Sequence, residues 1–281
     1  MNYRHAFHAG NAGDVLKHLV LLAILEALQR KDKPLFYLDT HAGRGLYNLG
    51  GEAARRSNEA AGGIVALAAA SELPPLAQRY LALVGSFNPG GGLEAYPGSP
   101  ALAAALLRPG DAAALCEIQP EEAAALRRLF AGDDHVAVHE RDGYEALRGL
   151  LPPRQGRGLV LIDPPYERRE AEYDLVVDAL ALAGERWPQG CLAAWYPIKR
   201  QEDTDRLVAR VAAGGRDAVL RVELTTRPAD NRAGLNGSGM ILVNAPWQLD
   251  QVLERTLPAV HTALAPGGAG AARVQWLVPP R

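Results

Sequence analysis

The run Gly158 to Ile162 carries no polar side chain and stops abruptly at the tetrapeptide 163–166, Asp-Pro-Pro-Tyr. Short runs that are apolar on both faces are typical of strands in a parallel sheet that helices cover on each side. Similar runs occur at 35–38, 112–117 and 191–196, and they alternate with segments of helical period. This alternation predicts an α/β protein with a doubly wound sheet.

The other elements follow from the same periodicities. Further strands are expected at 135–139, 218–224 and 240–243, and helices at 11–30, 100–107, 120–130, 142–150, 173–183 and 203–213. Asn11 is the expected N-cap of the first helix, whose end is basic. Residues 50–96 break the alternation, because they are rich in alanine and interrupted by prolines and by a run of three glycines. We therefore expect a helical insertion subdomain at 50–96 and a main domain formed by 1–49 and 97–281.

Composition narrows the class of protein further. The chain has 281 residues, of which 48% are hydrophobic and 22% charged, as in a soluble protein with a sizeable core. Its 30 basic and 32 acidic residues leave a formal charge of −2, so any binding of nucleic acid must use a local patch. The two cysteines lie outside any Cys/His cluster, and the longest early apolar run is Leu19 to Leu25. We expect a cytoplasmic protein without structural zinc, signal peptide or membrane span.

The residues just beyond the strands are the first candidates for a binding site, since ligands of such sheets bind at the carboxyl ends of the strands. Gly43 and Gly45 follow the first strand and would let backbone N–H groups approach a ligand closely. The third glycine of the dinucleotide-binding fingerprint is absent, with Asn48 in its place. An ordinary glycine turn therefore explains this loop as well as a cofactor loop does.

Two acidic residues follow the next strands along the chain. Glu117 ends one strand, where its carboxylate could accept both ribose hydroxyls of a nucleoside or merely cap the following helix. Asp142 and Gly143 follow the next strand, and Asp142 could accept a hydrogen bond from an adenine amino group. The alternative, that Asp142 is the N-cap of a helix over 143–150, is the stronger of the two.

The tetrapeptide Asp163-Pro164-Pro165-Tyr166 carries the most specific signal. The amino group of adenine is a poor nucleophile, because its lone pair is delocalised into the ring. If the Asp163 carboxylate and the Pro164 carbonyl accept its two hydrogens, the lone pair is localised toward a methyl donor while the Tyr166 ring stacks on the base. Proline adds no donor and stiffens the turn. The tetrapeptide predicts catalytic roles for Asp163, Pro164 and Tyr166; a merely rigid turn is a weaker alternative, and Tyr166→Phe is expected to cost little.

This motif is typical of S-adenosylmethionine-dependent methyltransferases that act on adenine N6, and other segments extend the likeness. They are Tyr3 to Asn11, Asp14 to His18, Tyr96 to Pro100 and Leu235 to Met240. With them the sequence resembles the RlmJ family of bacterial 23S ribosomal RNA adenine-N6 methyltransferases over nearly the whole chain. The resemblance implies a Rossmann-like methyltransferase fold with a small helical insertion subdomain. Ala245 departs from the pattern, because the family more usually has a second proline there.

The resemblance also implies roles for individual residues. The cofactor contacts would be His18, His41, Ser99, Glu117, Asp142, Gly143 and Asp163. Asp163 would also be the catalytic acceptor, Tyr3 would touch the RNA or close over the site, and Lys17 would help beside His18. Without the resemblance, Lys17 and His18 would be interpreted as an exposed helix face and Tyr3 as a frayed terminus.

The implied activity is methylation of N6 of an adenine in 23S ribosomal RNA, with S-adenosylmethionine as methyl donor and without a metal. The target base must be single-stranded or flipped out of its stack, so the enzyme is expected to act on accessible or protein-free RNA, as a monomer. The alternatives are a DNA adenine-N6 methyltransferase, a non-catalytic nucleic-acid-binding protein on the same fold and, more weakly, a dinucleotide-dependent oxidoreductase. No substantial domain for recognising duplex DNA follows Asp163, which disfavours the first of these.

Overall fold

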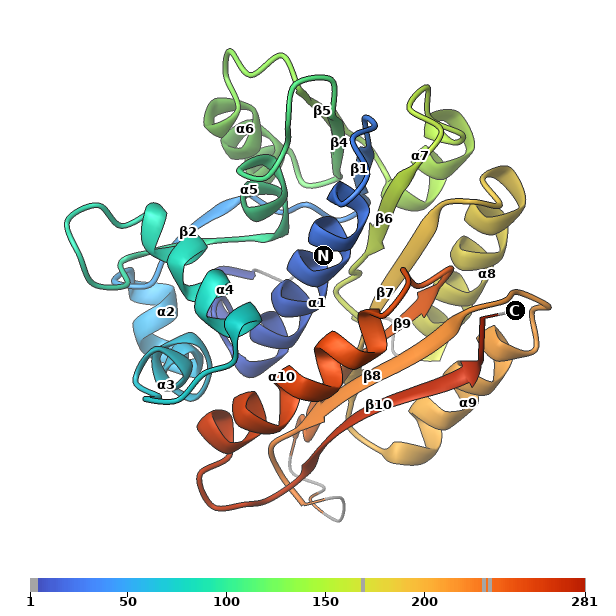
Figure 1. Ribbon diagram of the computed structural model, residues 1–281. Helices are drawn as coiled ribbons and strands as arrows, with labels where there is room; N and C mark the ends of the chain where they lie inside the picture. Colours follow the sequence, from blue (N-terminus) through green and yellow to red (C-terminus); the bar gives the residue numbers. More distant parts are fainter. Residues whose placement is uncertain (1–4, 168–169, 229–230, 232–233, 281) are drawn as a thin grey trace.

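The computed structural model describes residues 5–167, 170–228, 231 and 234–280, which surround an eight-stranded sheet (Figure 1). The strands are β1 (Phe36–Asp39), β4 (Ala112–Glu117), β5 (Val136–Glu140), β6 (Gly158–Ile162), β7 (Cys191–Ile198), β8 (Val219–Thr225), β9 (Gly237–Val243) and β10 (Ala271–Val278). Their order is β10-β8-β9-β7-β6-β1-β4-β5. The strands from β7 to β5 are parallel, whereas β9 is antiparallel to both neighbours and β10 is antiparallel to β8.

Helices cover both faces of this sheet. One face carries α1 (Ala12–Gln29), α5 (Ser99–Ala104), α6 (Pro120–Leu129) and α10 (Leu249–Leu264), and the other carries α7 (Gly143–Leu150), α8 (Glu170–Arg186) and α9 (Gln201–Ala212) (Figure 1). The two sets of helices belong to two separate clusters of buried apolar residues, one on each side of the strands. The expected doubly wound α/β fold is therefore confirmed.

The segment that interrupts the alternation is helical. It contains α2 (Glu52–Ser57), the short 3-10 helix η2 (Glu59–Gly62), α3 (Ile64–Ala68) and α4 (Pro75–Ser86). The strands that flank it, β2 (Leu46–Asn48) and β3 (Ala95–Pro97), pair with each other and close its ends together. Its apolar side chains, including Tyr80, join the core around α1, so a separate subdomain at 50–96 stays a prediction.

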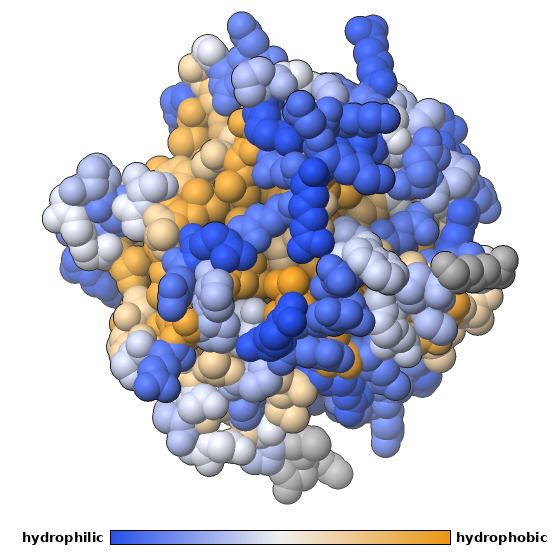
Figure 2. Space-filling model, in the orientation of Figure 1, coloured by the Kyte–Doolittle hydropathy of each residue, from blue (hydrophilic) through white to orange (hydrophobic). Residues whose placement is uncertain are grey.

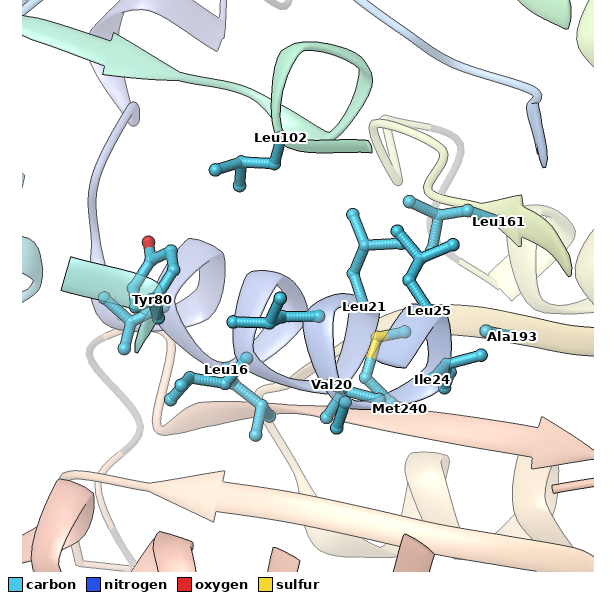
Figure 3. Packing of buried hydrophobic residues seen from close by; sticks show 14 of the residues in the cluster. Leu16, Val20, Leu21, Ile24, Leu25, Tyr80, Leu102, Leu161, Ala193 and Met240 are labelled. Carbon is cyan, nitrogen blue, oxygen red and sulfur yellow. The ribbon is translucent and has the colours of Figure 1, made fainter. Parts of the chain in front are cut away.

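Helix α1 is the central helix of the core. Every residue from Gly13 to Leu25 is buried, and the helix packs against β9, α10, α4 and α5. Figure 3 shows Leu102 of α5 on one side of the helix and Met240 of β9 on the other. A helix with no exposed face must bury its polar residues as well. Lys17 and His18 are therefore interior groups, and the interpretation as an exposed helix face is wrong.

The sequence reading missed the last two elements. Helix α10 contains Pro258, which is unusual inside a helix, and strand β10 is half-exposed at the edge of the sheet. Strand β9 also begins three residues earlier than predicted, at Gly237. A Cβ atom at Gly239 would lie 2.3 Å from the Tyr196 ring, so this strand needs glycine where strands ordinarily avoid it.

The surface on the side drawn in Figure 2 is mixed. Hydrophobic side chains reach the surface around α4 and α5, and hydrophilic residues cover most of the rest (Figure 2). Among the helices that the structure describes, none is both long and apolar enough to cross a membrane.

Candidate active site

A pocket opens at the carboxyl ends of β1, β4 and β6, where the order of the strands reverses about β1. Its empty volume is about 730 Å³, part of it open to solvent, which suits a cofactor-sized ligand. The lining residues are His5, Lys17, His41, Ala42, Gly43, Tyr47, Gly98, Ser99, Glu117, Ile118, Gln119, Glu122, Asp163 and Pro165. The fold thus gathers five of the predicted site residues around one space: Lys17, His41, Ser99, Glu117 and Asp163.

The end of β1 is tied to the start of α5 through a buried carboxylate. Asp39 accepts hydrogen bonds from the Tyr37 hydroxyl at 2.6 Å and from the Ser99 hydroxyl at 2.7 Å. Burial raises the pKa of Asp39, and these two hydrogen bonds oppose the rise. Ser99 therefore reaches the pocket from a position fixed by β1.

Glu117 lies in the pocket wall at the end of β4 and is only 8% exposed. Its carboxylate accepts the N–H of Gly43 at 2.9 Å and the N–H of Gln119 at 2.7 Å. Burial raises the pKa of Glu117, and the two hydrogen bonds oppose that effect. Gly43 has a φ of 62°, a conformation that glycine adopts at little cost. The carboxylate keeps further lone pairs with which it can accept the hydroxyl groups of a ligand.

The two predicted histidines are both neutral but lie in different places. His41 lines the pocket, and burial lowers its pKa to about 4. His18 is 1% exposed, and its Nδ1 lies 2.9 Å from the Tyr96 hydroxyl. Burial lowers the pKa of His18 to about 3, and its Nε2 has no partner among the described residues. His18 is not part of the pocket lining, so its predicted contact with a cofactor stays a prediction.

Asp142 and Gly143 have local roles in the fold and lie outside the pocket lining. Asp142 is the N-cap of α7, because its carboxylate accepts the N–H groups of Tyr144 and Glu145. A Cβ atom at Gly143 would lie 1.9 Å from the carbonyl oxygen of Thr40, so only glycine fits against the end of β1. The capping role of Asp142 is confirmed, and a contact of either residue with a cofactor stays a prediction.

Lys17 of α1 holds the side chain of Asp163, the residue that directly follows β6. The Lys17 ammonium lies 2.6 Å from Asp163 Oδ2 and 2.8 Å from Asp14 Oδ1. Burial lowers the pKa of Lys17, but the two carboxylates outweigh it and hold this pKa well above its usual range. Among the described residues, Lys17 alone donates a hydrogen bond to the Asp163 carboxylate. Asp163 Oδ1 is thereby left to accept a hydrogen bond from a ligand.

The chain turns sharply after Asp163. Pro164 is buried, and none of the described backbone N–H groups donates to its carbonyl oxygen. Tyr166 has a φ of 53°, which is uncommon outside glycine and asparagine. Its ring lies 5.3 Å from the Tyr173 ring and 5.8 Å from the Trp195 ring, and its hydroxyl donates to the Trp195 carbonyl at 2.6 Å. Tyr166 is thus fixed beside the pocket rather than in its lining.

The Tyr166 hydroxyl gives a first testable expectation. Tyr166→Phe keeps the ring for stacking but leaves the Trp195 carbonyl without its donor, so we expect a loss of about 1 kcal/mol in the free energy of unfolding. Thermal denaturation of the purified variant measures it. Tyr166→Phe should keep most of its activity at low temperature, and an unchanged melting temperature would show that the hydrogen bond contributes nothing.

Two carboxylates and a histidine were not predicted as site residues. Asp14 and Asp39 are almost fully buried beside the pocket, and His5 lines it from the 3-10 helix η1 (His5–Phe7). The spacing of Asp14 and Lys17, three residues apart on one helix, was a usable signal for the first of them. Tyr3, predicted to touch the RNA, lies outside the described residues.

A comparison with protein families decides what kind of protein this site belongs to. The family model described as "Ribosomal RNA large subunit methyltransferase D, RlmJ" matches residues 32–278. The chain belongs to this family. Two similar proteins, one from Escherichia coli (strain K12) and one from Haemophilus influenzae, are both named Ribosomal RNA large subunit methyltransferase J. They are 43% and 41% identical to this chain, over 99% of it and 99% of their own lengths.

A solved structure agrees with the membership in the RlmJ family. The crystal structure of a protein from Legionella pneumophila is 34% identical, has a TM-score of 0.88, and covers 95% of this chain and 98% of its own. Within the described residues there is no group of three or more His, Cys, Asp or Glu side chains that could hold a metal ion. The expected methyltransferase class and family are therefore confirmed, and the individual residue roles are the subject of the proposal below.

Proposed function

We propose that the protein transfers the methyl group of S-adenosylmethionine to N6 of an adenine in 23S ribosomal RNA. The observation that carries this proposal is the Asp163 carboxylate, which lies in the pocket at the end of β6 with Oδ2 held by Lys17. Its other oxygen can therefore accept a hydrogen of the adenine amino group. The names of the two bacterial relatives, both large subunit ribosomal RNA methyltransferases, support the substrate class.

The chemistry of the pocket fits S-adenosylmethionine. The Glu117 carboxylate lines the pocket and has lone pairs that can accept the two ribose hydroxyls, and the neighbouring Ile118, 48% exposed, can offer an apolar contact for the adenine ring of the cofactor. His41, Ser99 and Asp163 line the same space. The bound cofactor supplies a methyl group on a positively charged sulfur. His18, Asp142 and Gly143 remain proposed contacts from the family resemblance alone.

The protein's own groups prepare the amino group of the target base. Asp163 Oδ1 and the Pro164 carbonyl oxygen accept its two hydrogens and direct the nitrogen lone pair out of the ring. Lys17 fixes the carboxylate by donating to Oδ2 and compensates its charge in the buried site. Tyr166 lies beside the pocket with its hydroxyl donating to the Trp195 carbonyl, and its proposed role is to stack on the base. A base held in this way has left its stack, so the substrate is accessible or protein-free RNA. We further propose that the enzyme acts in the cytoplasm as a monomer.

The role of Glu117 leads to a prediction about cofactor affinity. Glu117→Gln keeps an oxygen for a backbone N–H but removes the negative charge that accepts the ribose hydroxyls. We expect S-adenosylmethionine to bind about 10- to 100-fold more weakly, as for loss of a hydrogen bond to a charged group. Isothermal titration of the cofactor measures this. Turnover at saturating cofactor should change little; if turnover fell while affinity stayed the same, Glu117 would belong to the methyl-transfer step.

Identification of the methylated product tests the proposed function. Labelled S-adenosylmethionine is offered with protein-free 23S RNA, assembled large subunits and duplex DNA in parallel, followed by digestion to nucleosides. The proposal expects N6-methyladenosine from the free RNA alone. Label in the DNA would instead indicate that the protein is a DNA adenine methyltransferase. Cofactor binding without label in any substrate would favour a nucleic-acid-binding protein on the same fold.

A further inference from the structure

The Asp14 carboxylate lies one side chain away from the proposed reaction centre and does not line the pocket. It is 3% exposed, so its negative charge needs partners within the protein. Oδ1 lies 2.8 Å from the Lys17 ammonium, and Oδ2 accepts the N–H of Gly10 at 2.9 Å and lies 3.1 Å from His5 Nε2. One carboxylate thus binds both the lysine that holds Asp163 and the segment that brings His5 to the pocket.

Lys17 needs this second partner in order to have one position. A lysine side chain has a flexible four-carbon stem and an ammonium that can donate hydrogen bonds in several directions, so one carboxylate does not fix its position. In the structure the ammonium lies between Asp14 of its own helix and Asp163 of the neighbouring loop. Asp163 Oδ2 is therefore held by a donor that is itself held, which leaves Oδ1 in one orientation toward the amino group.

The charged groups around Lys17 also indicate that the lysine depends on Asp14. The charged and titratable groups that interact with Lys17 are Asp14 and His18 on α1, Asp39 on β1, Tyr80 on α4 and Asp163 after β6; His5 on η1 contacts Asp14. His18 is neutral, and Asp14 and Asp163 are the carboxylates in direct contact. Burial disfavours the charged form of Lys17, and the two carboxylates favour it. If Asp14 is removed, Asp163 is the one contacting carboxylate left to offset the same cost of burial.

We propose that Asp14 is a positioning residue for methyl transfer, which holds the Lys17 ammonium in place and charged so that Asp163 presents a fixed oxygen to the target amino group. The inference rests on the proposed function, in which Asp163 accepts a hydrogen from that amino group. Asp14 itself touches neither the base nor the cofactor. Its contribution is therefore expected in the rate of transfer and in the pH dependence of that rate, and not in the affinity for S-adenosylmethionine.

The variant Asp14→Asn tests this inference. The amide keeps the size of the side chain and removes its charge, so we expect kcat to fall at least tenfold while the affinity for S-adenosylmethionine is kept. The alkaline limb of the pH profile, where kcat declines at high pH, should also shift to lower pH by about 1 to 3 units, because Lys17 then loses its proton more easily. An alkaline limb that stays where the unaltered enzyme has it would overturn the proposal, even if the variant is slow.

Two further variants separate positioning from folding. Asp14→Glu keeps the charge, and its alkaline limb is expected to stay close to that of the unaltered enzyme. Glu59→Gln is the matched control, because Glu59 binds His8 and Asn11 of the same N-terminal segment without contacting Lys17. It should loosen this segment and leave the alkaline limb in place. If Glu59→Gln moved the limb as far as Asp14→Asn does, the effect would belong to the segment as a whole and not to Asp14.

A readout without RNA distinguishes failure of this inference from failure of the proposed function. The reactivity of the Lys17 amine toward an acylating reagent is measured by mass spectrometry over a range of pH. In Asp14→Asn the onset of labelling should move to lower pH than in Glu59→Gln. Equal onsets would overturn the positioning role, whatever the substrate. Unequal onsets with no RNA methylation by the unaltered protein would leave the role of Asp14 toward Lys17 standing and refute the proposed function.

Discussion

Asp163→Asn is expected to lower turnover by about 10²- to 10⁴-fold, in the range measured when a group that handles the reacting proton or charge is removed. The asparagine oxygen will accept the hydrogen bond from Lys17, because the ammonium can only donate. The amide NH₂ then faces the adenine amino group, so a donor stands where an acceptor is needed. Single-turnover methylation of 23S RNA measures the rate of transfer directly.

Measurements of cofactor binding and of melting temperature make this prediction specific to the transfer step. S-adenosylmethionine should still bind to Asp163→Asn, since three other proposed cofactor contacts, Glu117, Ser99 and His41, are untouched. The melting temperature should fall only slightly, because Asp14 still neutralises Lys17. A rate close to that of the unaltered protein would rule out the Asp163 carboxylate as the acceptor. Loss of both folding and cofactor binding would leave the slow rate as a consequence of misfolding.

Lys17→Met is expected to have the largest effect on stability. The substitution keeps much of the volume but removes the cation between the buried Asp14 carboxylate and the partly exposed Asp163 carboxylate. Breaking a buried pair by removing one partner costs about 3 to 5 kcal/mol in the free energy of unfolding. Methyl transfer should also be lost, because the orientation of Asp163 depends on the ammonium. Denaturant unfolding and single-turnover kinetics measure the two effects separately.

The stability deficit of Lys17→Met should shrink as the solution is acidified. In the unaltered protein, burial raises the pKa of Asp14, but His5 and Lys17 outweigh it and hold this pKa well below the usual range. A lowered folded-state pKa gives stability that is present above the unfolded pKa and lost only as pH falls through the folded pKa. Without Lys17, one of the charges that lower the pKa of Asp14 is gone, so this pKa is higher than in the unaltered protein and a proton relieves the unpaired charge at a higher pH. The difference in melting temperature should therefore be larger at about pH 8 than at about pH 5. A difference that stays constant would show that the loss comes from packing and not from charge.

The fold and the pocket wall were predictable from the sequence because both depend on local patterns. Apolar runs of strand length marked the strands of the parallel sheet, and Glu117 and the motif at Asp163 stood directly at the ends of two such runs. Asn11 and Asp142 were predicted as N-caps, and both side chains accept backbone N–H groups in that position. Such features need only the residue and its near neighbours in the chain.

The parts that failed depend on contacts between distant segments. The depth at which α1 lies was not visible in its own spacing, so Lys17 and His18 were taken without the family resemblance as surface groups. The hydrogen bond of the Tyr166 hydroxyl needs the Trp195 carbonyl on a different strand. The prediction that Tyr166→Phe costs little activity stays untested, and the structure adds the expectation of a loss in stability. The role of Asp14 depends on Lys17 being buried and became visible only with the fold.

The pair at the centre of the site, Lys17 and Asp163, is separated by 146 positions in the sequence. The lysine comes from α1, and the carboxylate follows β6, which pairs with β1 although the helical insertion and four strands, β2 to β5, lie between them in the chain. Contacts of such long range form late, because the loop that they close loses much conformational entropy. During synthesis Lys17 of α1 must therefore remain without Asp163 until more than half of the chain has been made. Methyl transfer by this enzyme consequently requires a folded chain that extends from α1 at least to the loop after β6.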